Sequence, residues 1–166
     1  MYKTRKVKVP DEPDKAFAQA LKTAFNIIGY KDNTEHQLRE KLTEKGYGEE
    51  TVGQVVSYMM EKGFVDDRRM IYRLARSLAQ SRLYGRRRIM QELKRRHFAP
   101  DVLDSFDFDC EELEDVDFPQ CCLRLIKKRG GQRDEKTYAF LVRYGHTPTD
   151  IKNAYRLLTE KAEGED

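Results

Sequence analysis

The 166-residue chain lacks several features that define whole classes of protein. It has no tryptophan, and its three cysteines (Cys110, Cys121 and Cys122) are an odd number with two adjacent, which excludes a disulfide framework and favours free thiols. No apolar run approaches the roughly 18 residues of a membrane span. The basic N-terminus is not followed by the apolar segment of a secretory signal. We therefore expect a cytoplasmic protein without membrane contact.

Sequence motifs for nucleotide binding, metal binding and catalysis are also missing. There is no G-x-x-x-x-G-K-[ST] or G-x-G-x-x-G, and Gly130-Gly131 is interpreted as a turn. No C-x-x-C accompanies the scattered histidines, so a zinc site is not expected. Asp66-Asp67 is better interpreted as a helix N-cap than as a catalytic pair. We expect no enzyme, no cofactor and no metal.

The chain does contain helical periodicity almost throughout. Thr34-x-x-Gln37 forms a capping box, in which the threonine oxygen accepts from the N3 amide and the glutamine reaches back. Gly85 is interpreted as the end of a helix. Residues 1–14, with two valines and two prolines, predict an extended arm or short strand and then a linker.

Comparison of the chain with itself shows a threefold repeat. The copies read Leu38-x3-Leu42-x3-Gly46-Tyr47-x4-Val52, Ile89-x3-Leu93-x3-His97-Phe98-x4-Leu103 and Thr137-x3-Leu141-x3-Gly145-His146-x4-Ile151. An amphipathic helix precedes each copy, at about 15–28, 67–83 and 118–130. The pattern predicts a middle helix that ends in a tight turn, where an aromatic ring packs beneath the third helix; His146 takes the place of that ring in the last copy.

The predicted fold is all-α, with three tandem three-helix repeats in an elongated, curved array. The repeats cover residues 15–65, 66–106 and 118–161. They follow an N-terminal arm at 1–14, and an ordered acidic connector at 107–117 separates the last two. Because one such unit is small, stacking against its neighbours is expected to bury faces that water would otherwise cover.

Charge is distributed very unevenly along the sequence. The segment 68–96, here called the basic block, has eleven basic residues against the single acid Glu92, whereas 99–120 has nine acids and no base. The basic residues are Arg68, Arg69, Arg73, Arg76, Arg82, Arg86, Arg87, Arg88, Lys94, Arg95 and Arg96. All eleven are candidates for binding a partner or DNA, because guanidinium groups suit phosphates and carboxylates.

Two interpretations of the basic block remain open. It is either a solvated helical face that the 101–117 acids neutralise, or an electrostatic footprint for nucleic acid or an acidic groove. Tyr72 and Tyr84 lie among the arginines, and their spacing is more typical of core or rim positions than of base-stacking residues.

Some residues resemble a known family. Gly63-Phe64-Val65-Asp66-Asp67-Arg68-Arg69, followed by Leu83-Tyr84-Gly85-Arg86-Arg87-Arg88-Ile89-Met90-Gln91-Glu92-Leu93, is similar to the signature of the RecX family. Residues 34–47 resemble its first repeat, and 141–146 resemble the end of its third. Ile71, where a small residue is common, and His146, in place of a Phe-like residue, depart from the pattern.

The resemblance implies three tandem three-helix repeats and a regulatory partner, the bacterial recombinase RecA. Family members lodge in the groove of RecA filaments on single-stranded DNA and restrain strand exchange, ATP hydrolysis and co-protease activity, in the context of DNA repair and the SOS response. We expect this chain to do the same as a monomer. Reversal of Arg86, Arg87 and Arg88 to Glu is expected to preserve the fold and abolish inhibition.

Two alternatives remain. One is a stand-alone protein that binds nucleic acid non-specifically, single strands included. The other is a helical scaffold that binds a basic partner through its acids at 101–117. A sequence-specific transcription factor is not favoured. Its recognition helices would begin at Glu49-Glu50, Pro100-Asp101 and Pro148-Thr149-Asp150, whose acidic or apolar character does not suit phosphates or base edges.

Overall fold

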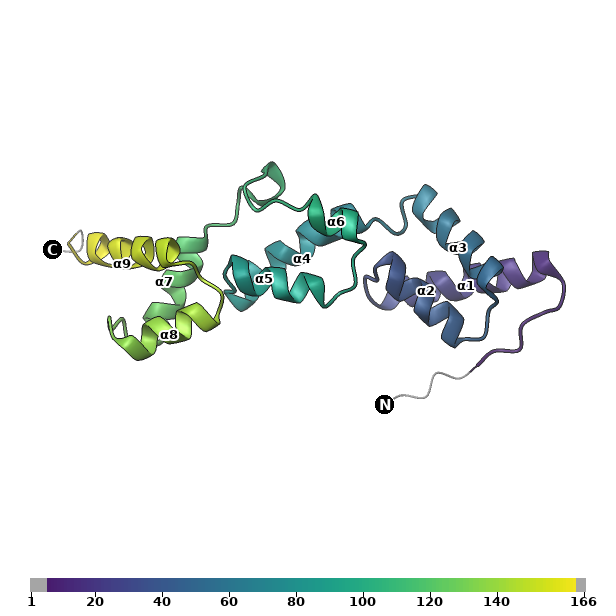
Figure 1. The fold of residues 1–166 in the computed structure, drawn as a ribbon, viewed down its shortest axis with the longest axis horizontal. Coiled ribbons are helices and arrows are strands. Elements are labelled where there is room, and N and C mark those ends of the chain that lie inside the picture. Colours follow the sequence, from purple (N-terminus) through teal and green to yellow (C-terminus); the bar gives the residue numbers. More distant parts are fainter. Residues whose placement is uncertain (1–5, 164–166) are drawn as a thin grey trace. The chain divides into compact units, whose positions relative to one another are not determined.

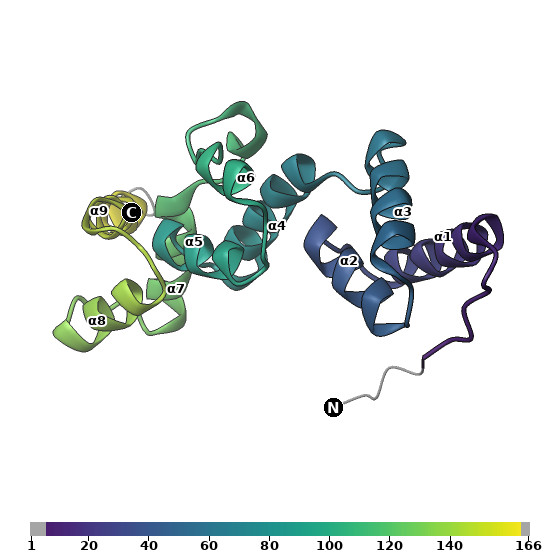
Figure 2. The same ribbon diagram turned by 45° about the vertical axis from the view of Figure 1, so that its right-hand side comes forward.

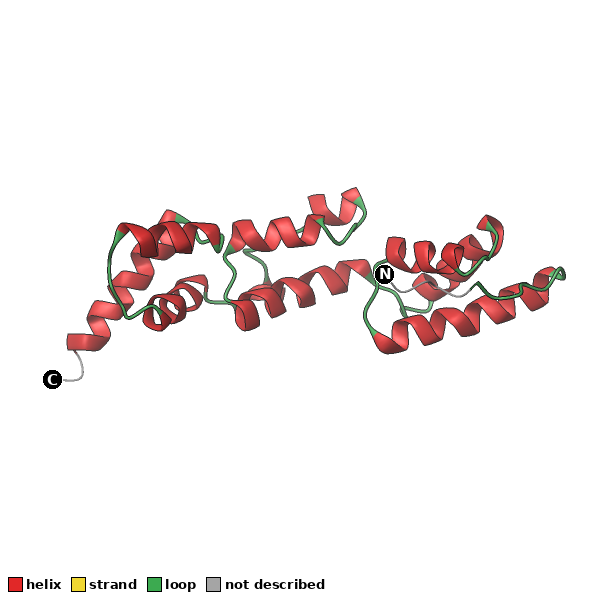
Figure 3. Cartoon of the chain, turned by 90° about the horizontal axis from the view of Figure 1, so that it is seen from below, coloured by secondary structure: helices red, strands yellow, loops and turns green. Residues whose placement is uncertain are grey.

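The structure, a computed structural model, describes residues 6–163, with side chains through Glu160. All regular structure in that range is helical (Figure 3). The α-helices are α1 (Pro13–Tyr30), α2 (Glu35–Glu44), α3 (Glu49–Glu61), α4 (Asp67–Arg82), α5 (Arg86–Lys94), α6 (Pro100–Asp104), α7 (Phe118–Lys128), α8 (Glu135–Arg143) and α9 (Pro148–Glu163), and a 3₁₀ turn, η1, covers Glu111–Leu113. The predicted all-α class is confirmed.

The helices follow one another in three successive sets of three, α1–α3, α4–α6 and α7–α9 (Figures 1 and 2). The third helix of the middle set, α6, has only five residues. Within α6 Val102 is buried, whereas Leu103, at the position of the sequence repeat, is only half-buried. The elongated, curved arrangement of the repeats stays a prediction.

The chain divides into two compact units, one comprising Met1–Met70 with His97–Val102 and the other Ile71–Arg96 with Leu103–Asp166. The first unit has a core of α1–α3 side chains that includes Leu38, Leu42 and Tyr47. The N-terminal arm packs on this core through Val7 and Val9, and the Val7 amide donates to the Lys45 carbonyl at 3.0 Å. The described part of the arm, from residue 6, forms no strand, and residues 1–5 lie outside the described range.

The core of the second unit gathers α7, α8 and α9 around Leu141 and Ile126. Cys121 and Cys122 are buried on α7, where they pack into the core as small apolar residues with free thiols. Burial raises the pKa of the Cys122 thiol to about 12, so the group stays protonated at neutral pH.

Within the second unit, a row of aromatic rings anchors the acidic connector. Phe106 contacts Tyr72 with a centroid separation of 5.1 Å and Phe108 at 4.8 Å, and Phe108 contacts Phe118 at 5.7 Å. Leu113, in η1, is buried. Offset and edge-to-face ring pairs stabilise beyond their buried area, so the row gives the connector a fixed path.

One turn recurs at the end of the middle helix of every repeat. The residue before the buried ring has a positive φ in all three copies: Gly46 at 101°, His97 at 56° and Gly145 at 90°. In the first copy the Gly46 amide donates to Thr43 and the Tyr47 amide to Leu42. These are the two hydrogen bonds of a Schellman motif, which explains why the repeated spacing ends in glycine followed by a ring.

His146 occupies the ring position of the third copy, as predicted, and is fully buried. Its Nε2 lies 3.0 Å from the carbonyl oxygen of Leu83. Since a carbonyl only accepts, Nε2 carries the proton, and Nδ1 has no hydrogen-bond partner among the residues that the structure describes. Burial lowers the pKa of His146, so the imidazole is neutral at physiological pH.

No helix within the described range combines the length and apolar character that a membrane span requires.

Candidate partner and nucleic-acid interface

The basic block is distributed over α4, α5 and the residues that follow α5. Arg68 and Arg69 lie in the first turn of α4 and belong to the first unit, whereas the other nine residues belong to the second. Asp66 caps α4, because its carboxylate accepts from the Arg69 amide at 2.9 Å. Asp67 instead accepts from the Glu35 amide at 3.0 Å and so caps α2.

Part of the block is paired with the acidic stretch, as the solvated-face interpretation requires. Arg68 contacts Asp101 at 3.2 Å, and Arg76 contacts Asp115 at 2.9 Å. Arg76 also donates to the Glu112 carbonyl, and Gln80 donates to Asp115. Desolvation alone would raise the pKa of Asp115, but the hydrogen bonds from Arg76 and Gln80 hold it below its usual value.

Arg86 is built into the packing of the second unit. Its guanidinium lies 3.1 Å from Asp150, whose side chain is 6% exposed, and 3.4 Å from Asp109. The same group sits 4.2 Å from the ring centroid of Phe118. Reversal to Glu would place a carboxylate beside a buried carboxylate, so we expect reversal of residues 86–88 together to destabilise the fold rather than preserve it.

Arg88, also in the first turn of α5, is likewise held by an ion pair and a ring contact. It pairs with Glu92 at 3.0 Å and lies 5.4 Å from the ring centroid of Tyr84. Tyr84 in turn makes an edge contact with Tyr144 at 5.6 Å. Tyr84, like Tyr72, is half-buried and contacts another ring, which agrees with the rim interpretation.

A different set of residues forms the solvent-facing side of α5. This set, here called the α5 face, consists of Arg87, Gln91, Lys94 and Arg95, and all four are exposed. Spacings of four, seven and eight residues from Arg87 place them on one side of the helix. Arg95 contacts Glu92 at 3.5 Å. Within the described range, Arg87 and Lys94 have no ion pair, and the same holds for Arg82 at the end of α4.

The start of α5 explains how three arginines are tolerated at a helix N-terminus. Gly85 is the N-cap and offers no side chain, and its amide donates to the Tyr144 carbonyl at 2.8 Å. The Arg87 amide donates to the Gly145 carbonyl at 3.2 Å. The free carbonyls at the end of α8 therefore satisfy the free amides at the start of α5 and offset the unfavourable helix dipole. Gly85 thus begins a helix, and its interpretation as a helix end is wrong; Leu83, with φ 58°, makes the turn.

Sequence reasoning missed the partner of Arg86. Asp150 lies 64 residues further along the chain and is itself an N-terminal residue of another helix, so no local pattern links the two. The run of acids at 101–117, by contrast, is visible in the sequence and contains the partners of both Arg68 (Asp101) and Arg76 (Asp115).

No group of three or more histidine, cysteine, aspartate or glutamate side chains in the described part of the chain is arranged to hold a metal ion.

The chain resembles known proteins in sequence. Its residues 20–59 match the model of the first three-helix domain of RecX, and residues 66–105 match that of the second. The chain is 30% identical over 127 residues to the regulatory protein RecX of Vibrio vulnificus, covering 74% of this chain and 78% of that protein. It is 26% identical over 147 residues to the RecX protein of Pelodictyon phaeoclathratiforme, covering 84% and 88%.

The fold is shared as well. The crystal structure of RecX from Lactobacillus salivarius superposes with a TM-score of 0.68 at 12% identity, covering 86% of this chain and 96% of that one. Sequence and fold agree, and the chain belongs to the RecX family of regulatory proteins.

Proposed function

We propose that this protein binds RecA filaments on single-stranded DNA and inhibits strand exchange, ATP hydrolysis and co-protease activity in DNA repair. Membership of a regulatory family supports the proposal. The observation that carries it is the α5 face, where Arg87 and Lys94 are exposed cations that pair with no carboxylate among the described residues.

The proposed mechanism is competition for the filament groove. The α5 face supplies attraction to phosphates or acidic side chains, since guanidinium and ammonium groups that are already solvated and unpaired lose no internal ion pair on binding. Arg86 and Arg88 contribute indirectly, because their contacts fix the helix that carries the face. No step of this mechanism makes or breaks a covalent bond.

The test is a titration of the protein against single-stranded DNA with and without RecA, at several salt concentrations. Binding that requires the filament supports the proposal. The charge-reversed variant Arg87→Glu/Lys94→Glu should bind the filament more weakly and with a shallower salt dependence, because two fewer counterions are released. Filament binding by this variant equal to that of the original protein would contradict the assignment of the α5 face.

The second candidate function is non-specific nucleic-acid binding without a filament partner. It is favoured by the same exposed cations, which suit bare phosphates equally well. Equal affinity for DNA in the presence and absence of RecA would support this candidate and reject the first. A base-reading function is not favoured, because α3 and α9 carry Glu49 and Asp150 in their first turns.

A further inference from the structure

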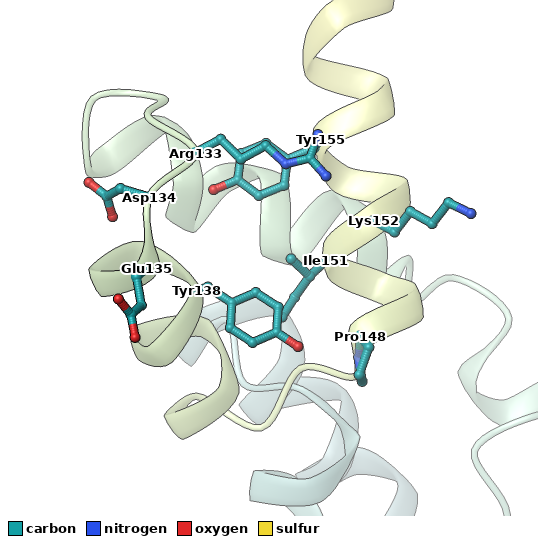
Figure 4. Close-up of a pocket in the computed structure, with 8 residues that line it drawn as sticks. All are labelled: Arg133, Asp134, Glu135, Tyr138, Pro148, Ile151, Lys152 and Tyr155. Carbon is teal, nitrogen blue, oxygen red and sulfur yellow. The ribbon is translucent and has the colours of Figure 1, made fainter.

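The last two helices, α8 and α9, border an open hollow that contains no residue of the α5 face. It has a volume of about 330 Å³ and lies between α9, the start of α8 and the loop that precedes α8 (Figure 4). Its lining includes Tyr138, Ile151, Tyr155, Arg133, Pro148 and Lys152. A volume of this size is at the lower end of small-ligand sites.

The two tyrosines of this hollow differ in exposure: the ring of Tyr138 is open to solvent, and that of Tyr155 is buried. Tyr138 is 45% exposed, and Figure 4 shows its ring standing in front of Ile151. Tyr155 is buried, and its hydroxyl donates to the Gln132 carbonyl at 3.0 Å. Arg133 lies over the Tyr155 ring, with 5.4 Å from the guanidinium carbon to the centroid, and is held at the rim.

The lining of the hollow includes two cations, Arg133 and Lys152, and two acids, Asp134 and Glu135, within a segment that is basic as a whole. Residues 118–160 contain nine Lys and Arg against four Asp and Glu. Of these acids, Asp134 caps α8 by accepting from the Thr137 amide, and Asp150 is bound to Arg86. In Figure 4 the carboxylates of Asp134 and Glu135 point away from the Tyr138 ring.

Cations continue into an adjoining hollow of about 500 Å³ along α9. That hollow shares Arg133, Lys152 and Tyr155 with the first and adds Arg156. Lys152 is exposed, and within the described residues it has no ion pair. An exposed ring with an apolar backing, next to a track of cations, is the combination that binds an unstacked base together with its backbone phosphates.

We propose that this hollow binds one nucleotide of a single-stranded nucleic acid, with the base against Tyr138 and the flanking phosphates at Arg133 and Lys152. A duplex keeps its bases stacked inside and cannot place one against the ring. The site lies apart from the α5 face and needs no filament, so it goes beyond the proposed function and is tested without RecA.

The experiment measures the affinity of the full-length protein for a labelled oligothymidylate and for a duplex of equal length, by fluorescence anisotropy. Stacking of one base contributes about 1–3 kcal/mol, so Tyr138→Ala should weaken single-strand binding about 5- to 150-fold and leave duplex binding unchanged. Tyr138→Phe should retain the affinity, because it keeps the ring. The matched control is Tyr30→Ala, which removes a 93% exposed tyrosine from α1 and should change neither affinity.

A second measurement locates the base directly. An oligonucleotide with 5-iodouracil should photocrosslink to the peptide that contains Tyr138, and the crosslink should disappear in Tyr138→Ala. Unchanged single-strand affinity in Tyr138→Ala, or an equal loss for single strand and duplex, would overturn the proposal. So would displacement of the label by an acidic tyrosine-containing peptide but not by unlabelled oligothymidylate, which would assign the hollow to a protein segment.

Discussion

Gly85 and Gly145 approach each other so closely that neither position has room for a side chain. A Cβ on Gly85 would lie 2.3 Å from the carbonyl carbon of Gly145, and one on Gly145 would lie 2.3 Å from the Arg88 amide nitrogen. The contact brings the end of α8 onto the start of α5. It is therefore what positions the α5 face.

Gly85→Ala is expected to destabilise the protein strongly. Gly85 has φ −81°, a conformation that alanine adopts freely, so the whole effect comes from collision with backbone atoms that cannot rotate away. We expect a loss of at least about 1–3 kcal/mol in the free energy of unfolding, measured by chemical denaturation. The control Gly53→Ala, on α3, meets only the end of Arg39 at 4.0 Å and should be stabilising by about 0.5–1 kcal/mol. Equal effects of the two substitutions would contradict the close approach.

Substitutions at the repeated left-handed turn should change stability in opposite directions in two of its copies. His97 pays a steric penalty at φ 56° that glycine does not, so His97→Gly is expected to raise stability by about 0.5–1 kcal/mol. Its ring stack on His36, at 5.2 Å, is exposed and offsets only part of that gain. Gly46→Ala, at φ 101°, should lower stability by about 1 kcal/mol. Thermal unfolding of both variants tests the sign, and destabilisation by His97→Gly would reject the account of the turn.

His146 should make the second unit sensitive to mild acid. Burial lowers its pKa in the folded state below the ordinary value near 6.5, so the unfolded chain binds a proton that the native state refuses. The stability associated with the neutral ring is complete above about pH 6.5 and is lost as the pH falls from there towards the lowered pKa.

The measurement is the free energy of unfolding between pH 7.5 and 5 for the original protein and for His146→Phe. The variant loses the hydrogen bond to the Leu83 carbonyl at every pH, so only the difference in slope is informative. The original protein should lose up to about 1.4 kcal/mol per pH unit more than the variant. Parallel curves would contradict a neutral, buried His146.

Arg86 and Arg87 are neighbours with different roles. Arg86→Ala leaves the buried carboxylate of Asp150 without its cation and should lower the free energy of unfolding by about 2–3 kcal/mol. This loss is at or below that usual for breaking a buried ion pair, because Arg86 is partly exposed. Arg87→Ala removes an exposed side chain that has no ion pair with any described residue, and it should change stability by less than about 0.5 kcal/mol. Chemical denaturation distinguishes them, and an equal loss in both would show that Arg87 is also structural.

Much of the fold could be predicted because it follows from local patterns. The spacing from Leu38 to Tyr47 encodes a buried helix face and a Schellman turn, and its three occurrences predict three helix sets. The capping box at Thr34 and Gln37 is present, with the Gln37 amide donating to the threonine oxygen at 3.1 Å. Such features depend on residues within one or two turns of each other.

The candidate site was less predictable because it depends on distant contacts. Composition identified the basic block, but Arg86 faces Asp150 while Arg87, one residue later, faces solvent, and only the placement of α9 decides this. The role of Gly85 likewise depends on the backbone of Gly145, sixty residues away, and its sequence neighbourhood resembles an ordinary helix end. The hollow beside Tyr138 is lined by residues from the loop before α8, the start of α8 and α9, and no sequence motif marks them.

The central claim is that the exposed cations of α5 are required for regulation of the recombinase. The most direct measurement is RecA-dependent strand exchange at physiological salt, with the original protein, with Arg87→Glu/Lys94→Glu and with the control Lys22→Glu/Lys62→Glu, which reverses two exposed lysines of the first unit. We predict that the original protein and the control inhibit strand exchange equally, and that the α5 variant folds but does not inhibit. Full inhibition by a folded Arg87→Glu/Lys94→Glu variant would contradict the claim.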